Sequence, residues 1–375
     1  AEVVWKPLGE VCKVLRGKRL TKKELSDEGI YPVFHGGLIP LGYYNSYNRR
    51  GNQTMVINTG SIGEVVWSGV DFWSSDGTFV VETNDVIEDK FLYYYLKTKE
   101  QYLKSQKREG GVPTIDRSVV EKLPIPLPPL SVQQEIVRIL DKFTQLEAEL
   151  EAELEAELEG RKRQYEYYRN HLLSYEENKV EWKALGEVGT FIRGNGLQKK
   201  DLITSGIPAI HYGQIYTYYG VSAEQTISFV SPETAKGLRK VDYGDVIITN
   251  TSENIDDVGK AVAYCVKEQG VTGGHATIFK PSEKIIGKYL VYYTQTTEFS
   301  NQKRKYAKGT KVIDVSANDL AKIIIPLPPL EDQQRIATIL DKFDTLVNSI
   351  SEGLPKEIAL RRKQYEYYRE QLLRF

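Results

Sequence analysis

The sequence contains an internal repeat, and this repeat constrains the fold more than any other feature. Ile125–Phe143 (IPLPPLSVQQEIVRILDKF) matches Ile325–Phe343 (IPLPPLEDQQRIATILDKF) at 14 of 19 positions. Arg161–Leu173 matches Arg361–Leu373 at 9 of 13 positions, at the same offset of 200 residues. A chain written twice in this way is expected to fold as two copies of one structural unit.

A third pair of similar segments marks the starts of two modules. Trp5–Val11 (WKPLGEV) recurs as Trp182–Val188 (WKALGEV). Between the repeated segments, residues 40–85 and 215–285 share little beyond a strand-like pattern. Neutral drift after duplication would blur the tails as well as the middles. We therefore favour two modules on a common frame that recognise different things.

The modules combine strand and helix patterns. Met55–Trp67 and Asp245–Asn250 are β-branched and apolar with Gly or Asn turns, which is typical of strands. Lys90–Gln106 and Lys288–Arg304 have helical spacing. We predict an α+β fold class, with helices packed on mixed or antiparallel sheet. The repeat gives four segments: a first module at 1–124, a connector and central long helix at 125–178, a second module at 179–324, and a connector and distal helix at 325–375.

The two tails predict long paired helices. The prolines of IPLPPL exclude helix there, so this segment is expected to be an extended connector. A helix should run from Ser131 to about Ser174, with Ser131 and Gln134 fitting an N-terminal capping box. Its narrow leucine stripe needs a partner, and the second tail has a matching stripe, broken at Gly353–Pro355. If the tails pair, the chain order requires an antiparallel coiled coil and a pseudo-twofold repeat.

The formal net charge is -1 over 375 residues, but the charge is segregated. The two modules together carry +5 and the helical segments -6. Glutamate occupies every second position from Glu147 to Glu159, within a repeating LEAE pattern. This surface could face a basic partner, point away from phosphates, or simply be solvated. The repeat could also act as a ruler, since each unit adds about 6 Å of helix.

Composition excludes several classes of protein. No run approaches the roughly 18 apolar residues of a membrane span. The start of the chain lacks the pattern of a secretion signal, and Cys12 and Cys265 are too few for a disulfide framework. We therefore expect a soluble, cytoplasmic protein.

The order of these elements resembles a known family. A module, IPLPPLxxQQxIxxILDKF, a long helix, RKxQYxYYRxxLL, then VEWKxLGE and a second module are similar to the specificity subunits of type I restriction-modification enzymes. The LEAE repeat resembles the four-residue repeat of the type IC branch. The resemblance covers the whole chain. It implies two target recognition domains, each reading one half of a bipartite double-stranded DNA target.

The same resemblance implies partners and cofactors. The helices would set the spacing of the half-sites and dock two modification (methyltransferase) subunits. Motor and nuclease restriction subunits would join through the complex. S-adenosylmethionine, ATP and magnesium would be held by those partners, and this chain would hold no cofactor.

Candidate DNA-binding residues occur in both modules. Phosphate contacts need Lys and Arg in loops, and base contacts need side chains that match groove edges. A charge run is usually a solvated face, but clusters recur here at the same relative places, and His35 aligns with His211. The candidates in module one are Arg16, Lys18, Arg19, Lys22, Lys23, His35, Tyr43, Tyr44, Asn45, Arg49, Arg50, Lys107 and Arg108. Those in module two are Arg193, Lys199, Lys200, His211, Gln214, Tyr216, Tyr218, Lys303, Arg304, Lys305, Lys308 and Lys311.

The repeated QYEYYR motif suggests two equivalent docking contacts, one for each modification subunit. The alternatives are DNA contact, or coiled-coil packing with the tyrosine hydroxyls at the edge. The candidate docking residues are Tyr165, Tyr168, Arg169, Tyr365, Tyr368 and Arg369.

Catalytic motifs are poorly represented. The four histidines and two cysteines lack metal-ligand spacing, and neither a phosphate-binding glycine loop nor a methylation motif occurs. Glu88–Lys90 formally fits a nuclease motif, but it opens a predicted helix, where acids favour the positive end of the dipole. We therefore predict a non-catalytic subunit that recognises DNA. The competing hypotheses are a helical scaffold with protein-binding modules and a stand-alone nuclease.

Overall fold

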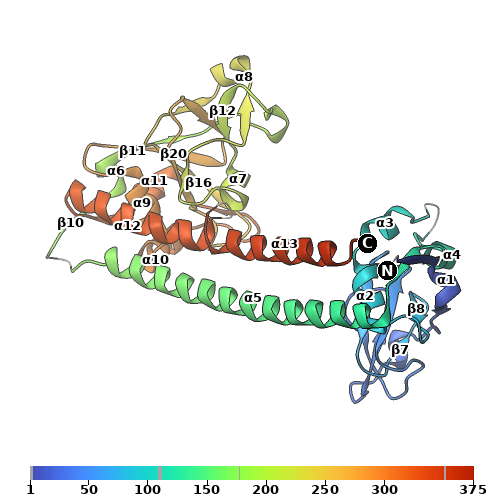
Figure 1. Cartoon of the computed structure of the whole chain (residues 1–375). Helices are drawn as coiled ribbons and strands as arrows, with labels where there is room; N and C mark the ends of the chain where they lie inside the picture. Colours follow the sequence, from blue (N-terminus) through green and yellow to red (C-terminus); the bar gives the residue numbers. More distant parts are fainter. Residues whose placement is uncertain (1–2, 109–111, 177, 350–351) are drawn as a thin grey trace. The chain divides into compact units, whose positions relative to one another are not determined.

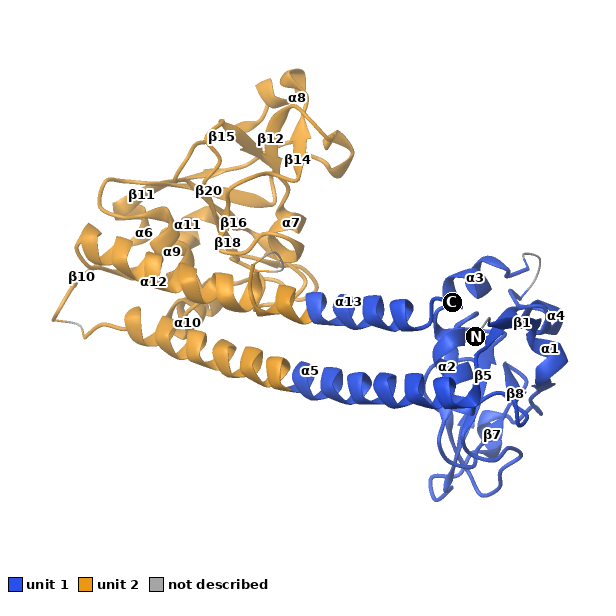
Figure 2. Ribbon diagram, viewed as in Figure 1, with its two compact units in different colours: residues 1–152, 359–375 blue, residues 153–358 orange. Residues whose placement is uncertain are grey.

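The computed structural model describes residues 3–108, 112–176, 178–349 and 352–375, which fall into two compact units (Figure 1, Figure 2). Unit one comprises residues 1–152 and 359–375, and unit two comprises residues 153–358. Each unit contains one module and part of both helical tails. The compact units therefore cut across the four segments predicted from the sequence. Two α+β modules separated in the chain by a long helix confirm the predicted fold class.

Among its described residues, unit one contains two sheets of more than two strands, besides a two-stranded pair described below. The first is antiparallel throughout, and the second joins one antiparallel pair to one parallel pair. The first sheet has the order β2 (Lys13–Arg16), β8 (Thr78–Glu82), β5 (Gln53–Ile57) and β6 (Val65–Ser68), and the second has the order β4 (Gly42–Tyr44), β3 (Tyr31–Phe34) and β7 (Trp73–Ser74).

Unit two repeats the order of these strands despite the loss of sequence similarity. Each of its two main sheets has one further strand at an edge, and the one in the first sheet pairs in parallel with its neighbour. Its first sheet has the order β11 (Gly189–Arg193), β20 (Ala276–Pro281), β16 (Val246–Thr249), β18 (Ala261–Tyr264) and β13 (Ser222–Ala223). Its second has the order β14 (Ser228–Val230), β12 (Ile207–Ile210), β19 (Gly270–Thr272) and β15 (Arg239–Val241). The pairing of β12 with β19 is parallel, as is that of β3 with β7. A short pair, β17 (Thr251–Ser252) and β21 (Ile313–Asp314), is added.

The central strand of each first sheet is buried on both faces. In β5, Met55 belongs to one apolar cluster and Val56 to another, because successive side chains point to opposite faces. In β16, Ile247 and Ile248 divide between two clusters in the same way. This two-sided burial explains the apolar runs Met55–Ile57 and Val246–Ile248. The predicted strand segments are confirmed: Met55–Trp67 covers the end of β5, a turn and most of β6, and Asp245–Asn250 covers β16.

The helix predicted after each sheet is divided in two. Unit one has α2 (Asp89–Lys97) and α3 (Glu100–Ser105), and unit two has α9 (Gly287–Thr294) and α10 (Thr297–Tyr306). The prediction of one continuous helix was therefore wrong in each module. Threonine causes the break: the Thr98 hydroxyl donates back to the Tyr95 carbonyl, and the Thr296 hydroxyl caps α10 by accepting from the amide of Phe299.

Short helices complete the modules and connect the strands. They are α1 (Leu8–Val11), η1 (Lys22–Glu24) and α4 (Arg117–Glu121) in unit one, and α6 (Leu185–Val188), η2 (Lys199–Asp201), α7 (Tyr212–Thr217), α8 (Pro232–Lys236) and α11 (Ala317–Leu320) in unit two.

The proline-rich connector closes each module. It is extended, as predicted, and pairs antiparallel with the WKxLGE start of its own module. In unit one, β1 (Val4–Pro7) pairs with β9 (Pro124–Leu127). In unit two, β10 (Glu181–Ala184) pairs with β22 (Ile324–Leu327). The two repeated motifs at the edges of each module are therefore structural neighbours.

The helical tails also follow the prediction. The first tail forms α5 (Leu130–Leu172), and the second forms α12 (Leu330–Asn348) and α13 (Leu354–Leu372). The break before α13 falls at the predicted Gly353–Pro355. The predicted capping box was wrong, because α5 begins at Leu130 and Ser131 already lies inside its first turn.

A buried glutamine attaches each helix to its module. The Nε2 of Gln133 donates to the carbonyl oxygens of Pro128 (2.8 Å) and Val86 (3.0 Å), and its Oε1 accepts from the amide of Glu88 (2.8 Å). Gln133 is fully buried. The side chain thus satisfies three backbone groups that the approach of the helix removes from water.

Gln333 repeats this arrangement in unit two. It is fully buried, donates to the carbonyl oxygens of Pro328 (2.9 Å) and Lys284 (3.0 Å), and accepts from the amide of Ile286 (2.9 Å). The same attachment therefore occurs twice.

An aspartate two turns further along forms a second attachment. Asp141 accepts from the Tyr94 hydroxyl (2.6 Å) and pairs with the Lys90 ammonium (2.7 Å). In unit two Asp341 accepts from the Tyr292 hydroxyl (2.6 Å) and pairs with Lys288 (2.9 Å). Loss of solvation and the bond to Asp341 both raise the pKa of Tyr292, so its proton stays in this bond.

The helices pair antiparallel inside each unit. In unit one, Phe143 lies against Tyr368, and further along α5 Glu151 pairs with Arg362. Residues further along α5 therefore contact residues earlier in α13, so the two helices are antiparallel. In unit two, Tyr168 stacks on Phe343 with ring centroids 5.3 Å apart. In both units the phenylalanine of one tail's ILDKF motif contacts the last tyrosine of the other tail's QYEYYR motif: Phe143 contacts Tyr368 in unit one, and Phe343 contacts Tyr168 in unit two.

We expect Gln133→Ala to lower the free energy of unfolding of unit one by about 2–4 kcal/mol, because three buried backbone groups lose their partners. Gln134→Ala is the matched control, since Gln134 is exposed on the same turn and its loss should cost less than about 0.5 kcal/mol. Urea unfolding, with hydrogen exchange to locate the loss, measures both. Equal effects of the two variants would contradict the proposed attachment.

Candidate nucleic-acid interface

Module one contains a cleft of about 520 Å³ that gathers predicted DNA-binding residues. Arg16, Arg19, Lys22 and His35 all line it. The three cations come from the end of β2 and the segment that follows, and all three are exposed. Gly17 permits this chain path, because a Cβ there would lie 1.9 Å from the Ser75 carbonyl oxygen. The geometry gives a positively charged hollow with a histidine in its wall.

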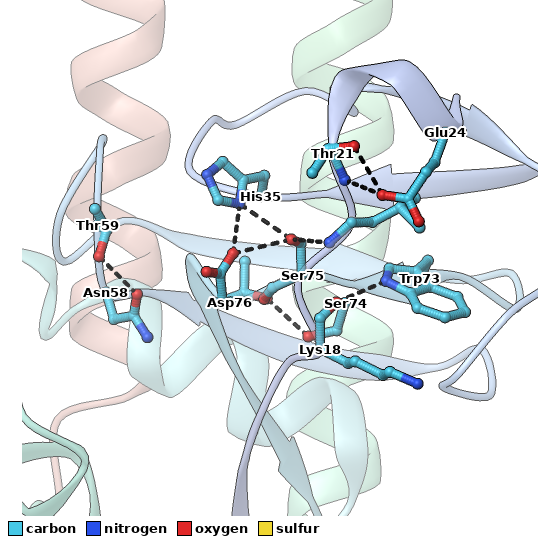
Figure 3. A network of polar contacts seen from close by, with 12 residues as sticks. Lys18, Thr21, Glu24, His35, Asn58, Thr59, Trp73, Ser74, Ser75 and Asp76 are labelled. Atoms are coloured by element: carbon cyan, nitrogen blue, oxygen red, sulfur yellow. Dashed lines mark hydrogen bonds and ion pairs between the residues drawn. The ribbon is translucent and has the colours of Figure 1, made fainter. Parts of the chain in front are cut away.

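His35 is held by a polar network (Figure 3). Its Nδ1 lies 3.2 Å from the Ser75 hydroxyl and 3.3 Å from the Asp76 carboxylate. The Ser75 hydroxyl donates to Asp76 (3.1 Å) and accepts from the Leu20 amide (3.2 Å). In Figure 3 the other ring nitrogen of His35 points away from Ser75 and Asp76. The ring is thus fixed on one side and open on the other.

Four further predicted residues of module one have exposed side chains. Lys18, Lys23, Tyr43 and Asn45 are exposed. The Lys18 carbonyl accepts from the indole N–H of Trp73 (2.8 Å), so the backbone there is fixed while the ammonium remains outside. Lys18 and Trp73 are drawn in Figure 3.

The pair of arginines after this loop is partly used within the module. Arg49 donates to the Arg16 carbonyl (3.4 Å), and Arg50 pairs with Asp71 (3.3 Å) while lying over the ring of Tyr47. Arg49 is half-buried and Arg50 is exposed. Arg50 therefore has the more accessible cation.

The remaining module-one candidates lie apart from His35. Tyr44 packs edge-on against Trp73, with ring centroids 5.3 Å apart. Lys107 lines a neighbouring cavity of about 600 Å³, which shares Thr59 and Val112 with the first. Arg108 forms an ion pair with Asp116. The structure thus brings Lys107 close to the cleft and engages Arg108 within the fold.

Module two places a different set of side chains at the equivalent position. His211 follows β12 as His35 follows β3, and its Nδ1 accepts from the Gly213 amide (3.2 Å). Tyr212 packs against both His211 and His275, at centroid distances of 4.6 and 4.8 Å. Burial, and then the neighbouring His275 and Lys199, lower the pKa of His211. A cluster of tilted aromatic rings here replaces the Ser75–Asp76 pair of module one.

Gln214 and Tyr216 have structural partners. Gln214 accepts from the His211 amide (2.9 Å) and donates to the Ser228 hydroxyl (2.5 Å). The Tyr216 hydroxyl donates to the Thr251 carbonyl (2.7 Å). Tyr218 is 60% exposed. Of these three predicted base-reading residues, Tyr218 alone has a largely open side chain.

The cationic candidates of module two differ in exposure. Arg193, Lys199, Lys200, Lys305 and Lys311 are exposed. Arg193 donates to the carbonyl of Gly274 (3.2 Å), the residue before His275. Arg304 pairs with Asp256 (2.5 Å) and Lys308 with Asp319 (3.8 Å), although both remain exposed.

Lys303 requires a correction. It is 4% exposed, and its ammonium donates to the Asp256 carbonyl (3.0 Å). Loss of solvation lowers its pKa. Helical spacing explains the error: Lys303 lies on the inward face of α10, whereas its neighbours Arg304 and Lys305 lie on the outward face. Lys303 therefore holds the fold and does not present a charge to phosphate.

The candidate docking residues are largely used in helix packing. Tyr165 is buried against Phe343, Arg169 lies over its ring, and Tyr365 bonds to the Thr144 hydroxyl (2.7 Å). Arg369 lies over Tyr365 in the same way. Packing thus accounts for these four residues. Tyr168 and Tyr368 keep 37% and 45% of their surfaces exposed.

Glu88–Lys90 also has a structural role. Glu88 caps α2 by accepting from the Phe91 amide (2.5 Å), Asp89 accepts from the Thr83 hydroxyl, and Lys90 pairs with Asp141. The three side chains point to different partners. Within the described residues, no group of three or more His, Cys, Asp or Glu side chains is arranged to hold a metal.

Sequence reasoning missed the residues that orient the two histidines. Ser75 and Asp76 carry no local motif, and strand pairing across tens of residues brings them to His35. Only Tyr212, adjacent to His211 in the chain, was within reach of a local pattern. None of the described helices has the length and apolar character needed to cross a bilayer.

Comparisons with known proteins agree with this architecture. The sequence profile of the type I restriction modification DNA specificity domain matches residues 2–160 and 177–360, once for each module. The Escherichia coli type I restriction enzyme EcoR124I/EcoR124II specificity subunit is 35% identical over 398 residues, covering 100% of this chain and 95% of that protein. The Methanocaldococcus jannaschii MjaVIII specificity subunit is 25% identical over 368 residues, covering 91% and 85%.

Solved structures share the fold. A chain from a structure of complex assembly in the type I restriction-modification system has a TM-score of 0.72 at 19% identity, covering 99% of this chain and 97% of that one. The HsdS subunit of Thermoanaerobacter tengcongensis has a TM-score of 0.58 at 19% identity, covering 99% and 96%. The chain therefore belongs to the family of specificity subunits of type I restriction-modification systems.

We expect substitution of Lys303 to change the stability of the fold and substitution of Lys305 to change DNA binding. Lys303→Gln should lower the free energy of unfolding by about 1–3 kcal/mol, because a buried hydrogen bond is disturbed. Lys305→Gln should leave stability within about 0.5 kcal/mol and reduce the slope of log affinity against log salt by about 1 if Lys305 contacts a phosphate. Thermal unfolding and salt-dependent DNA binding separate the two roles. A Lys303→Gln variant as stable as the parent would contradict the structural role of Lys303.

Proposed function

We propose that each module reads one half of a bipartite double-stranded DNA target, and that the chain itself carries no catalytic centre. The main support is the repeated frame with different side chains around the histidine that the two modules share. The two modules share strand order, the buried glutamine and the paired aspartate. At equivalent positions, one presents His35 with an acidic partner and the other presents His211 within a cluster of tilted aromatic rings. Two different reading surfaces on one frame suit a target with two different halves.

The positive charge suits DNA, but the amount is small. Arg16, Arg19 and Lys22 surround the first cleft, and Arg193 lies beside the second histidine cluster. A net charge of +5 over both modules is modest for a chain that must hold a long duplex alone. The proposal therefore assigns base reading to this chain and much of the phosphate contact to partner subunits.

The partner subunits would be two modification (methyltransferase) subunits, with restriction subunits added to form the full complex. S-adenosylmethionine, ATP and magnesium would be bound by those partners. Tyr168 and Tyr368 support equivalent docking positions, since both are half-exposed at corresponding places on the paired helices. We place the complex in the cytoplasm, and the LEAE repeat favours the type IC branch.

The scaffold hypothesis is less well supported. Protein-binding modules on paired helices would not require cations to line the cleft that contains His35. The nuclease hypothesis is also less well supported, because the residues of its motif have structural roles: Glu88 caps a helix and Lys90 is paired with Asp141.

We expect the purified chain, assembled with its modification subunits, to methylate DNA that carries two separated half-sites far better than DNA that carries either half alone. When one module binds its half-site, the second half-site is held near the other module at a high effective concentration. DNA that carries both halves is therefore bound more tightly than DNA that carries one. A methylation assay on a randomised library identifies the halves. Magnesium-dependent cutting by this chain alone, or methylation without a bipartite preference, would contradict the proposal.

We expect deletion of one four-residue LEAE unit to shorten the preferred spacer by one or two base pairs and to leave both half-sites unchanged. Four residues span about 6 Å of helix, and DNA rises about 3.4 Å per base pair. A four-residue insertion into a surface loop of a module is the matched control and should leave the spacer unchanged. A deletion variant that keeps the original spacer would show that α5 does not set it.

A further inference from the structure

The two modules place a histidine at the same position but fix its ring in opposite ways. His35 directly follows β3 and His211 directly follows β12, the strands that pair in parallel with β7 and β19. In each case only Nδ1 is bonded within the described residues. Nε2 of both rings has no hydrogen-bond partner among the described residues. The group bonded at Nδ1 therefore determines what Nε2 can offer.

Both groups facing Nδ1 of His35 are acceptors. The Ser75 hydroxyl gives its single proton to the Asp76 carboxylate, at 3.1 Å. The Ser75 oxygen, 3.2 Å from Nδ1, can therefore only accept from the ring, and the Asp76 carboxylate at 3.3 Å is also an acceptor. In the neutral imidazole the proton must lie on Nδ1. The Nε2 of His35 then carries a lone pair.

The situation at His211 is reversed. Its Nδ1 accepts from the backbone amide of Gly213 at 3.2 Å, and a backbone amide can only donate. The ring proton must therefore lie on Nε2. Burial, His275 and Lys199 lower the pKa of His211, which favours the neutral ring that the bond from Gly213 requires. The Nε2 of His211 is a donor.

We propose that His35 and His211 read DNA bases with opposite hydrogen-bond polarity. Nε2 of His35 accepts from an exocyclic amino group, which in the major groove is offered only by adenine and cytosine. Nε2 of His211 donates to guanine N7 or O6, thymine O4 or adenine N7, and so discriminates against cytosine. Asp76 is a positioning residue that sets the tautomer of His35.

This inference rests on the proposed function, in which each module reads one half-site. It goes further because it restricts one base in each half. The cleft geometry supports base contact at His35, since Arg16, Arg19 and Lys22 line the same hollow and are placed to hold the phosphate backbone.

Nitrogen-15 NMR of the full chain labelled at histidine tests the tautomers directly. At pH 8, where an ordinary imidazole is neutral, we expect the His35 signals to report a proton on Nδ1 and the His211 signals a proton on Nε2. His35→Gln and His211→Gln assign the signals. Asp76→Asn should convert His35 to a mixture of tautomers, because the amide can also donate. The same tautomer at both sites, or a doubly protonated His35, would overturn the inference.

Methylation of a randomised bipartite library by the assembled complex tests the reading. His35→Gln offers both a donor and an acceptor, so it should relax one position of the first half-site by about tenfold and leave the second unchanged. Asp76→Asn should relax the same position, and His211→Gln should relax one position of the second half-site only. Unchanged preferences in all three variants would overturn the inference while the proposed function stands. If the parent complex shows no bipartite preference, both fail.

Discussion

One buried glutamine and one paired aspartate hold each module on its helix, and the other features of the structure depend on that attachment. Gln133 satisfies backbone groups on both sides of the junction between the connector and the module, and Gln333 does the same in the second unit. Asp141 and Asp341 then fix the rotation of the helix against the tyrosine and lysine of the module. A buried polar group of this kind fixes one geometry, because any other leaves it without a partner.

This attachment explains why the repeat survives in some segments and not in others. The tails and edges must keep the residues that join module to helix. The middles have only to keep two-sided apolar strands, such as those containing Met55 and Ile247, in the same order. The loops between these strands are not held by the attachment, and the side chains around His35 and His211 do differ. Common attachment and variable loops together allow two recognition surfaces on one chain.

Much of the fold could be predicted from the sequence, because its signals are local. Proline exclusion located the connectors, glycine and proline located the break before α13, and the leucine stripe located α5. Features that depend on distant partners could not be found. Local pattern favoured Ser131 and Gln134 at the helix start, whereas the attachment is made by Gln133 to residues near 86. Lys303 was wrongly predicted to be exposed, because the sequence does not show that its ammonium bonds to the Asp256 carbonyl inside the module. Likewise, strand pairing alone brings Asp76 to His35.

Replacement of the second module by a second copy of the first tests the central claim most directly. Residues 185–323 would be replaced by a second copy of residues 8–123, so that both sets of tails and both attachment residues Gln133 and Gln333 remain. Methylation profiling of DNA from a host that carries this chain with its modification subunits then reports the target. The account predicts a target with two copies of the half-site that the first module reads in the parent. Retention of the second parental half-site, or a folded complex that methylates without sequence preference, would contradict it.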